Sequence, residues 1–364
     1  MPFDPKIPFN DLPRLPPAAF WNDVEILKAT NAANVALAQL NAAAATLPNP
    51  MLLVAPLAVR EAKASSEIES IYTTLSEIFA AESSSEAPKD PAAKEVLAYR
   101  DALMAGFKLV RGKGFLATND YLTIQAALEP AKLGVRRIPG TAIVRESADG
   151  TRQTMYTPPD GERNILRLLT DFEKFFNAPS ADPDPLVAAA ICHYQFEAIH
   201  PFLDGNGRTG RILAVLQLTL SGRLNLPILF LSGYVLAHKA AYYRLLRGVT
   251  EKGDWKLWTL YFLDAVAVQA RRGVATVGDV GKLIAGATPA VRDVSPGKSE
   301  ALLAYLFSRT AYGRAHLAKS LGISALTASA YLEKLVAAKL LRKVRVTGRE
   351  WGYRYPEFLK TLEG

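Results

Sequence analysis

Helical spacing recurs along most of this 364-residue chain, and that recurrence limits the possible folds more than any other feature. Apolar side chains return at every third or fourth position, which is the pattern of a helix with one buried face. Proline and glycine interrupt the pattern and divide it into separate helices. The stretches with this spacing are residues 23–45, 56–81, 92–111, 119–128, 163–177, 185–199, 207–221, 237–250, 256–274, 299–308, 314–321 and 325–338. A mainly α-helical fold follows.

Two places break from the helical pattern. Residues 141–145 and 151–156 are short segments separated by Asp149-Gly150, a dipeptide typical of a tight hairpin turn. Residues 342–346 and 351–355 alternate between apolar and polar side chains near the C-terminus. The sequence therefore predicts two β-hairpins in an otherwise helical protein.

Length and composition are those of a soluble globular protein. The length suggests two or three domains at about 150 residues each, and 49% hydrophobic with 21% charged residues is ordinary for a folded soluble chain. No run approaches the ~20 apolar residues of a membrane-spanning helix, and the N-terminus has no signal-peptide pattern. The single Cys192 fits a reducing compartment. We expect a cytoplasmic protein without a membrane segment.

Changes in composition divide the chain into four parts. We expect an N-terminal helical region over residues 1–110 and a central core over residues 111–283. A stretch rich in Gly, Ala, Pro and Ser, residues 284–298, is expected to be a linker, followed by a small domain over residues 299–364.

The basic charge is concentrated at the C-terminus. Of the net charge of +8, residues 312–364 carry +6, from ten Lys and Arg against four Asp and Glu. Three helical patterns, a turn at residues 322–324 and the C-terminal hairpin together predict a winged helix-turn-helix domain. Its basic side chains favour contact with the DNA backbone through residues 312–355. Dimerisation or protein docking by the same domain is the alternative.

The segment HPFLDGNGRTGR, residues 200–211, carries the densest chemistry in the sequence. Its glycines open a helix, so several backbone N–H groups and the positive end of the helix dipole form an anion-binding cradle. Arg208 and Arg211 share one face of that helix and suit a polyphosphate. Asp204 is a hard carboxylate of the kind that Mg²⁺ on a nucleotide prefers. His200 is a candidate general base.

Other phosphate-binding loops fit this sequence less well. Residues 205–210 match the pattern G-x-G-x-x-G, but a dinucleotide-binding fold needs a strand before the loop and an acidic residue about 20 positions after it. The preceding segment is helical, and no Asp or Glu occurs between Asp204 and Glu251. The chain has no complete P-loop pattern G-x-x-x-x-G-K-[S/T] and no His-Arg-Asp set of a kinase.

Residues 200–211 resemble the signature of the Fic (filamentation induced by cAMP) family, H-x-F-x-[D/E]-G-N-G-R-x-x-R, at every fixed position. His193, Phe196 and Glu197 resemble the approach to that motif, and residues 134–159 resemble the family's β-hairpin flap. The resemblance implies a Fic-type helical core carrying this flap.

The resemblance further implies transfer of AMP from ATP to a Tyr, Thr or Ser hydroxyl of a target protein, and of the chain itself, with release of pyrophosphate. By position, His200 would deprotonate the hydroxyl and Asp204 would hold Mg²⁺. The residues matched to ATP and its phosphates are Gly205, Asn206, Gly207, Arg208, Thr209, Gly210 and Arg211.

Two further contacts follow from the same resemblance. The flap would align the target segment by strand addition, and a tyrosine of residues 242–243 would lie near the adenine. The residues concerned are Ile143, Val144, Arg145, Tyr242 and Tyr243.

The segment SSEIES, residues 65–70, resembles the family's inhibitory motif, [S/T]-x-x-x-E-[G/N]. The resemblance implies that Glu69 pairs with Arg211 and denies that guanidinium to the γ-phosphate of ATP. In some relatives the same glutamate orients a water that removes AMP, so de-AMPylation is a second hypothesis for Glu69. Ser70 departs from the motif, where Gly or Asn is usual. The alternative for Glu69 is a solvated acid on an exposed helix face.

Two other functions stay open as alternatives. One is transfer of a different phosphate-bearing group by the same site. The other is a DNA-binding regulator whose Fic core senses nucleotide without transferring it. Adenylylated hydroxyls, detected after incubation with ATP and Mg²⁺, would separate the enzyme from the regulator. A homodimer is a further partner hypothesis.

Overall fold

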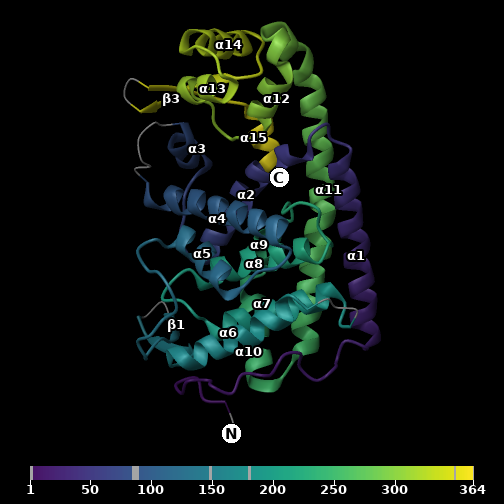
Figure 1. The fold of residues 1–364 in the computed structure, drawn as a ribbon, viewed down its shortest axis with the longest axis vertical. Helices are drawn as coiled ribbons and strands as arrows, with labels where there is room; N and C mark the ends of the chain where they lie inside the picture. The colour runs from purple at the N-terminus through teal and green to yellow at the C-terminus, as the bar shows by residue number, and fades with distance from the viewer. Residues whose placement is uncertain (1–2, 84–89, 147–149, 179–181, 348–349, 364) are drawn as a thin grey trace. The chain divides into compact units, whose positions relative to one another are not determined.

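The computed structural model describes residues 3–83, 90–146, 150–178, 182–347 and 350–363. Helices dominate this part of the chain, which confirms the mainly α-helical prediction (Figure 1). The helices, with two short 3-10 helices η1 and η2, are α1 (Val24–Ala45), η1 (Pro50–Leu53), α2 (Val54–Ile68), α3 (Leu75–Ser83), α4 (Pro91–Lys113), α5 (Thr118–Leu128), α6 (Glu162–Phe176), α7 (Pro185–Ile199), α8 (Asn206–Leu220), α9 (Leu231–Ala237), α10 (Lys239–Lys252), α11 (Trp255–Val294), η2 (Pro296–Lys298), α12 (Ser299–Phe307), α13 (Arg314–Leu321), α14 (Ala325–Ala337) and α15 (Pro356–Glu363).

Both predicted hairpins are present. Strands β1 (Ile143–Glu146) and β2 (Arg152–Tyr156) pair antiparallel, with an irregularity in register between Ile143 and Val144. Strands β3 (Arg342–Thr347) and β4 (Glu350–Arg354) pair antiparallel as well. Gly150, which precedes β2, has a positive φ of 80°, a conformation that glycine adopts without steric cost.

The chain divides into two compact units, and each is described by itself. The first comprises residues 1–38, 101–227 and 231–268; the second comprises residues 39–100, 228–230 and 269–364. The expected domain division at residues 110, 283 and 298 stays a prediction; α1, α4 and α11 each contain residues of both compact units. Among the described residues, no single helix has both the length and the apolar composition of a membrane span; residues 24–45 and 50–68 reach them only as a bent pair.

Helix α7 forms the centre of the first unit. It packs against α6 and α8, and α5 packs against α6 and α8 in turn. Most residues of the helix are apolar, and thirteen of its fifteen residues are buried. Asp184 caps its start by accepting a hydrogen bond from the Leu186 amide at 2.8 Å, with Pro185 at the first helical position. A helix buried on all sides fixes the position of whatever follows its C-terminus.

The helix predicted over residues 56–81 is instead two helices. α2 ends at Ile68 because Ser70 adopts a left-handed conformation with φ of 65°. The Ile71 and Ser70 amides then donate to the carbonyl oxygens of Ser66 and Glu67 at 3.0 and 3.1 Å, which is the Schellman pattern of a helix terminus. The left-handed position coincides with the place where the inhibitory motif usually has Gly or Asn, so that preference has a backbone cause.

The expected linker over residues 284–298 is wrong for most of its length, because α11 continues to Val294 with Pro289 inside it. Ile284, Ala287, Val291 and Val294 are all buried and recur at helical spacing. Burial of this stripe outweighs the local cost of one proline and of the small residues around it.

The C-terminal elements follow the order expected from the sequence: α12, α13, α14 and the hairpin β3–β4, with the unforeseen α15 at the end. α13 packs against α14, and Tyr312 forms a β-bridge with Tyr353 that joins the start of α13 to β4. Within the same unit, α15 packs against α2, which ends one residue before Glu69.

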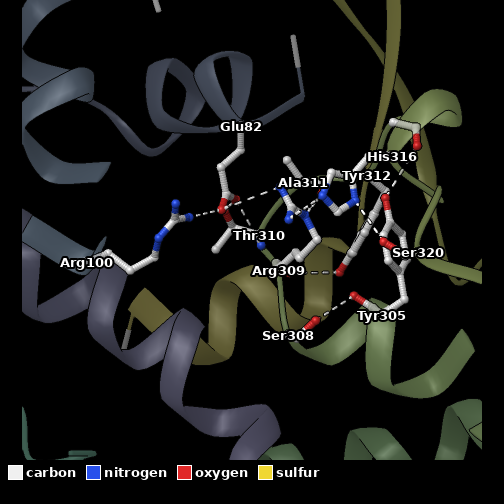
Figure 2. A network of polar contacts seen from close by, with 11 residues as sticks. Glu82, Arg100, Tyr305, Ser308, Arg309, Thr310, Ala311, Tyr312, His316 and Ser320 are labelled. Carbon is white, nitrogen blue, oxygen red and sulfur yellow. Dashed lines mark hydrogen bonds and ion pairs between the residues drawn. The ribbon is translucent and has the colours of Figure 1, made fainter. Parts of the chain in front are cut away.

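A buried carboxylate connects α3 to these C-terminal helices (Figure 2). The Glu82 side chain is only 3% exposed and forms an ion pair with Arg100 of α4. It also accepts hydrogen bonds from the backbone amide of Thr310, at 3.3 Å, and from its hydroxyl, at 2.5 Å. Because Thr310 lies in the turn between α12 and α13, the contact fixes that turn to α3.

Candidate functional site

The segment that joins α7 to α8 begins with a histidine in a strained conformation. His200 is the C-cap of α7, and its φ of 47° and ψ of 58° lie in the left-handed region that non-glycine residues rarely adopt. Five residues later, Gly205 has φ of 79° and is the N-cap of α8. Two left-handed residues thus reverse the chain between two buried helices, and such strain is typical of functional turns.

Asn206 holds the turn closed. Its side-chain Oδ1 accepts from the Phe202 amide at 2.8 Å, and its Nδ2 donates to the Phe202 carbonyl oxygen at 2.9 Å. The residue is buried, so this paired contact is shielded from competing water. The asparagine of the motif therefore fixes the loop itself, in addition to its predicted place beside the phosphates.

The N-terminus of α8 has the properties of an anion site. Gly205, the N-cap residue, makes no side-chain capping hydrogen bond, so it leaves the first-turn amides of this helix to other acceptors. Arg208 and Arg211 are buried, and so is Thr209. Among the described residues, the buried Thr209 hydroxyl has no hydrogen-bond partner. Two arginines, the first-turn amides and a hydroxyl lie in one helical turn, which suits a phosphate group.

Asp204 is a carboxylate that stays ionised. Its Oδ1 accepts from the Gly205 amide at 2.7 Å and lies 3.7 Å from Nη2 of Arg208, and its Oδ2 pairs with Lys132. Burial raises the pKa of Asp204, but the hydrogen bonds from Lys132 and Gly205 outweigh it and hold the pKa below its ordinary value. An ionised, partly exposed carboxylate beside a candidate phosphate site fits Mg²⁺, which binds through one or two carboxylates together with water and phosphate. No cluster of three His, Cys, Asp or Glu occurs within residues that the structure describes, so the donors present do not suit an all-protein metal cage.

Three charged residues that precede the β1–β2 hairpin contact the motif, and the sequence pattern does not point to them. Glu129 Oε1 lies 2.5 Å from Nη2 of Arg208, and Lys132 pairs with Asp204. Arg136 is almost fully buried, and its Nε donates to the carbonyl oxygen of His200 at 2.8 Å. These residues precede the motif by 64 to 79 positions, and only the fold brings them to it. The pattern of charges in a loop carries no signal of such contacts.

Arg136 holds the end of α7 in place. Besides His200, its guanidinium donates to the carbonyl oxygens of Ile199, at 3.3 Å, and Pro159. A helix C-terminus has carbonyl groups without partners in the helix and a partial negative charge, and a cation satisfies both. Burial lowers the pKa of Arg136, but a guanidinium remains charged throughout the physiological range.

His193 lies beneath the motif and connects α7 to α8 and α10. Its Nδ1 lies 3.2 Å from the carbonyl oxygen of Gly210, and its Nε2 lies 2.9 Å from the hydroxyl oxygen of Tyr242. Burial and the charge of Arg211 lower the pKa of His193 to about 3. The ring is therefore neutral and structural. Tyr242 is buried in this contact, whereas Tyr243 is 41% exposed, so Tyr243 is the more accessible of the two residues predicted near the adenine.

The hairpin β1–β2 is joined to the motif at its base. The Tyr156 hydroxyl donates to the Ala198 carbonyl oxygen at 2.7 Å, two residues before His200. Every residue of β1 is exposed, including Ile143, Val144 and Arg145. Within the described sheet, β1 pairs with β2 alone, and its other edge has backbone groups available for another strand.

Glu69 belongs to the second unit. It is the C-cap residue of α2, its side chain is exposed, and its amide donates to the Ser66 carbonyl oxygen at 3.0 Å. The motif and the flap belong to the first unit. The predicted pairing of Glu69 with Arg211 therefore stays a prediction.

Comparison with known sequences agrees with the motif. Residues 27–108 match the sequence profile of the Fic/DOC family N-terminal region, and residues 115–218 match that of the Fic/DOC family. A protein adenylyltransferase Fic of Aedes aegypti is 31% identical over 150 residues, which are 40% of this chain and 28% of the relative. The corresponding protein of Drosophila melanogaster is 30% identical over 133 residues, 35% of this chain and 26% of the relative. The match thus spans less than a third of these relatives.

Solved structures share the fold. A Fic family protein from Desulfovibrio desulfuricans G20 aligns with a TM-score of 0.58 at 20% identity, covering 92% of this chain and 96% of that one. Fic-1 of C. elegans, residues 134–508, aligns with a TM-score of 0.52 at 22% identity, covering 71% of this chain and 73% of that one. The first alignment extends over nearly the whole of both chains, so the likeness goes beyond the central helices.

Proposed function

The chain belongs to the Fic/DOC family, and from that membership we propose that it is a nucleotidyltransferase that moves AMP from ATP to a hydroxyl of a protein. One observation carries the proposal. His200, held in a left-handed conformation at the end of α7, is separated by a short clamped turn from the uncapped N-terminus of α8 with its two buried arginines. A base beside an anion site is the arrangement that phosphoryl transfer to a hydroxyl requires.

In the proposed reaction His200 takes the proton of a Tyr, Thr or Ser hydroxyl of the target protein. The hydroxyl oxygen forms a bond to the α-phosphorus of ATP, and the bond from that phosphorus to its bridging oxygen breaks. The electron pair leaves with pyrophosphate. The first-turn amides of α8, with Arg208 and Arg211, stabilise the charge that develops on the phosphates. When bound through Asp204, Mg²⁺ would neutralise phosphate charge.

The exposed edge of β1 supports strand addition as the way the target is presented. A segment paired to Ile143, Val144 and Arg145 contributes backbone hydrogen bonds that depend little on its sequence. The Tyr156 contact to Ala198 fixes the base of the hairpin near His200. The target hydroxyl would then be delivered to the base whatever its neighbours are.

The test is incubation of the full chain with α-labelled ATP and Mg²⁺, followed by mass spectrometry. We expect adenylylated hydroxyls on the chain itself, and none in the variant His200→Ala. His238→Ala, which replaces a histidine outside the motif, is the matched control and should keep the label. A chain that binds ATP but acquires no label even with the substitution Glu69→Gly would contradict the proposal and favour a nucleotide sensor.

Autoinhibition by Glu69 is a second element of the proposal. Its support is the inhibitory pattern at residues 65–70 and the exposed carboxylate at the end of α2. Glu69→Gly should increase self-adenylylation, because it removes the carboxylate proposed to compete with phosphate for Arg211. Glu67→Gly, two residues earlier in the same segment, is the control. Equal labelling of the Glu69 variant and the unchanged protein would contradict autoinhibition by Glu69.

DNA binding is a second candidate function, and one observation favours it. Lys343 and Arg345 of β3 lie over the ring of Trp351, at 5.4 and 5.2 Å from its centroid, and Trp351 is 47% exposed. Basic groups around an exposed aromatic ring suit a nucleic acid. Binding of a labelled duplex should weaken in the double variant Lys343→Gln/Arg345→Gln and not in Lys282→Gln. Absence of binding at low salt would contradict this function.

A further inference from the structure

The turn that follows α5 supplies a partner to each of two charged side chains in the phosphate motif. Glu129 pairs with Arg208, and Lys132 pairs with Asp204. The turn is itself fixed: the Lys132 amide donates to the Glu129 carbonyl oxygen at 3.1 Å, and Gln125 Nε2 donates to the Lys132 carbonyl oxygen at 2.8 Å. A cation and an anion are thus presented to the motif from one short segment.

The two pairs differ in exposure. The Arg208 side chain is buried, so its pairing with Glu129 is shielded from solvent and orients the guanidinium. The side chains of Lys132 and Asp204 are 50% and 41% exposed. An exposed pair of this kind is worth little in stability, so it can open without a large cost. A displaced Lys132 also reaches water directly.

Lys132 contacts the same carboxylate that fits a divalent cation. Lys132 donates a hydrogen bond to Asp204, and the two side chains form an ion pair. An ammonium group and Mg²⁺ prefer the same oxygen, and a cation already in contact with it also repels a second one. The geometry therefore sets up a competition for Asp204.

We infer that Lys132 is a tethered cation that occupies the metal carboxylate until Mg²⁺ arrives with the nucleotide, and that it thereby sets the metal concentration at which the site fills. The inference rests on the proposed function. Lys132 is here a residue that tunes the site through Asp204, and it takes no part in the bond changes. Its removal should make metal binding tighter.

The experiment is titration calorimetry of the full chain with a non-hydrolysable ATP analogue at graded Mg²⁺ concentrations. In Lys132→Met the Mg²⁺ concentration for half-maximal analogue binding should fall about twofold to fivefold, the range that an exposed ion pair supports. Analogue binding in EDTA should not change. Lys132→Arg, which keeps a cation, and Lys174→Met, which removes an exposed lysine from α6, should behave like the unchanged protein.

Three results would overturn the inference. Weaker analogue binding by Lys132→Met in EDTA would make Lys132 a phosphate ligand. An Mg²⁺ requirement that is the same in Lys132→Met and the unchanged protein would mean that the Lys132–Asp204 ion pair does not affect metal binding. A shift that persists when Asp204→Asn is also present would mean that Lys132 does not act through that carboxylate, because coupled residues are non-additive. If the unchanged protein bound no analogue at all, both the inference and the proposed function would fail. If the analogue bound but Lys132→Met caused no shift, only the inference would fail.

Discussion

The imidazole of His193 receives a hydrogen bond from the hydroxyl of Tyr242 across 2.9 Å. The direction follows from the other ring nitrogen. Nδ1 faces the carbonyl oxygen of Gly210, which can only accept, so Nδ1 carries the proton and Nε2 of the neutral ring has a lone pair. One neutral histidine thus joins α7, α8 and α10 beside the motif at residues 200–211.

Tyr242→Phe should destabilise the protein by about 1–3 kcal/mol, because it leaves a buried ring nitrogen without its donor while changing little else. The free energy of unfolding in urea measures this cost. Tyr243→Phe removes a hydroxyl from the neighbouring, exposed ring and should change the free energy by no more than about 0.5 kcal/mol. Equal effects of the two substitutions would mean that the His193 contact contributes nothing.

Stability should depend on pH through His193. Its pKa is about 3 in the folded protein and about 6.5 when the chain is unfolded. At a pH between these two pKa values, His193 binds a proton in the unfolded state and stays neutral in the folded state. Stability is therefore complete above about pH 6.5 and is lost as the pH falls towards 3, by up to about 1.4 kcal/mol per pH unit.

The measurement for this pH dependence is urea unfolding at pH 5, 6 and 7. Comparison with His193→Gln cancels the titration of carboxylates, because those groups are the same in both proteins. The difference in stability between the two proteins should shrink as the pH falls. A difference that is constant over this range would show that the pKa of His193 is the same in the folded and unfolded states.

Ser70→Gly should stabilise the protein by about 0.5–1 kcal/mol. Serine at φ of 65° is strained by its Cβ, and glycine relieves this strain at the C′ position of a Schellman terminus. Part of that gain is offset because glycine loses more conformational entropy on folding. Ser70→Ala retains a Cβ and should bring no gain. Thermal unfolding of the three proteins distinguishes the conformational effect from loss of the hydroxyl. A gain in the alanine variant would contradict the assignment to backbone strain.

Glu82→Ala should cost about 3–5 kcal/mol, because it leaves Arg100 without its buried partner and Thr310 without its acceptor (Figure 2). Glu82→Gln keeps the shape of the side chain and should have an intermediate cost. Glu357→Ala, on the exposed face of α15, is the control and should stay within about 0.5 kcal/mol of the unchanged protein. Urea unfolding measures all three. A small effect of Glu82→Ala would mean that water replaces the carboxylate.

The sequence predicts the elements around the motif well, because local signals agree there with tertiary structure. Residues 185–199 are mostly apolar, which predicts a buried helix, and the glycines at 205 and 207 mark the start of the next one. The Asp149-Gly150 dipeptide predicts the hairpin in the same way, and Asp149 itself lies outside the described residues. The failures occur where composition and burial disagree. Residues 284–294 look like a linker by content, and their buried stripe is helical.

The residues of the candidate site also fall into those that the sequence predicts and those that it does not. Residues 200–211 are adjacent in the chain, so their joint function is visible in their order. Glu129, Lys132 and Arg136 are ordinary charged residues of a loop until α5 and the chain after it pack beside α8. Their importance depends on distances across the fold, and a single sequence does not contain those distances.

Arg136 links the local unfolding of two segments beside the motif. One buried guanidinium accounts for three carbonyl groups, two at the end of α7 and one at Pro159, just beyond β2. Withdrawal of that side chain would leave all three carbonyl groups without their donor at once. Local unfolding of the end of α7 or of the segment at Pro159 would therefore break the contacts of both. The turn that carries His200 and the chain leaving the hairpin are thereby bound into one cooperative unit, whose amides share a common free energy of local unfolding.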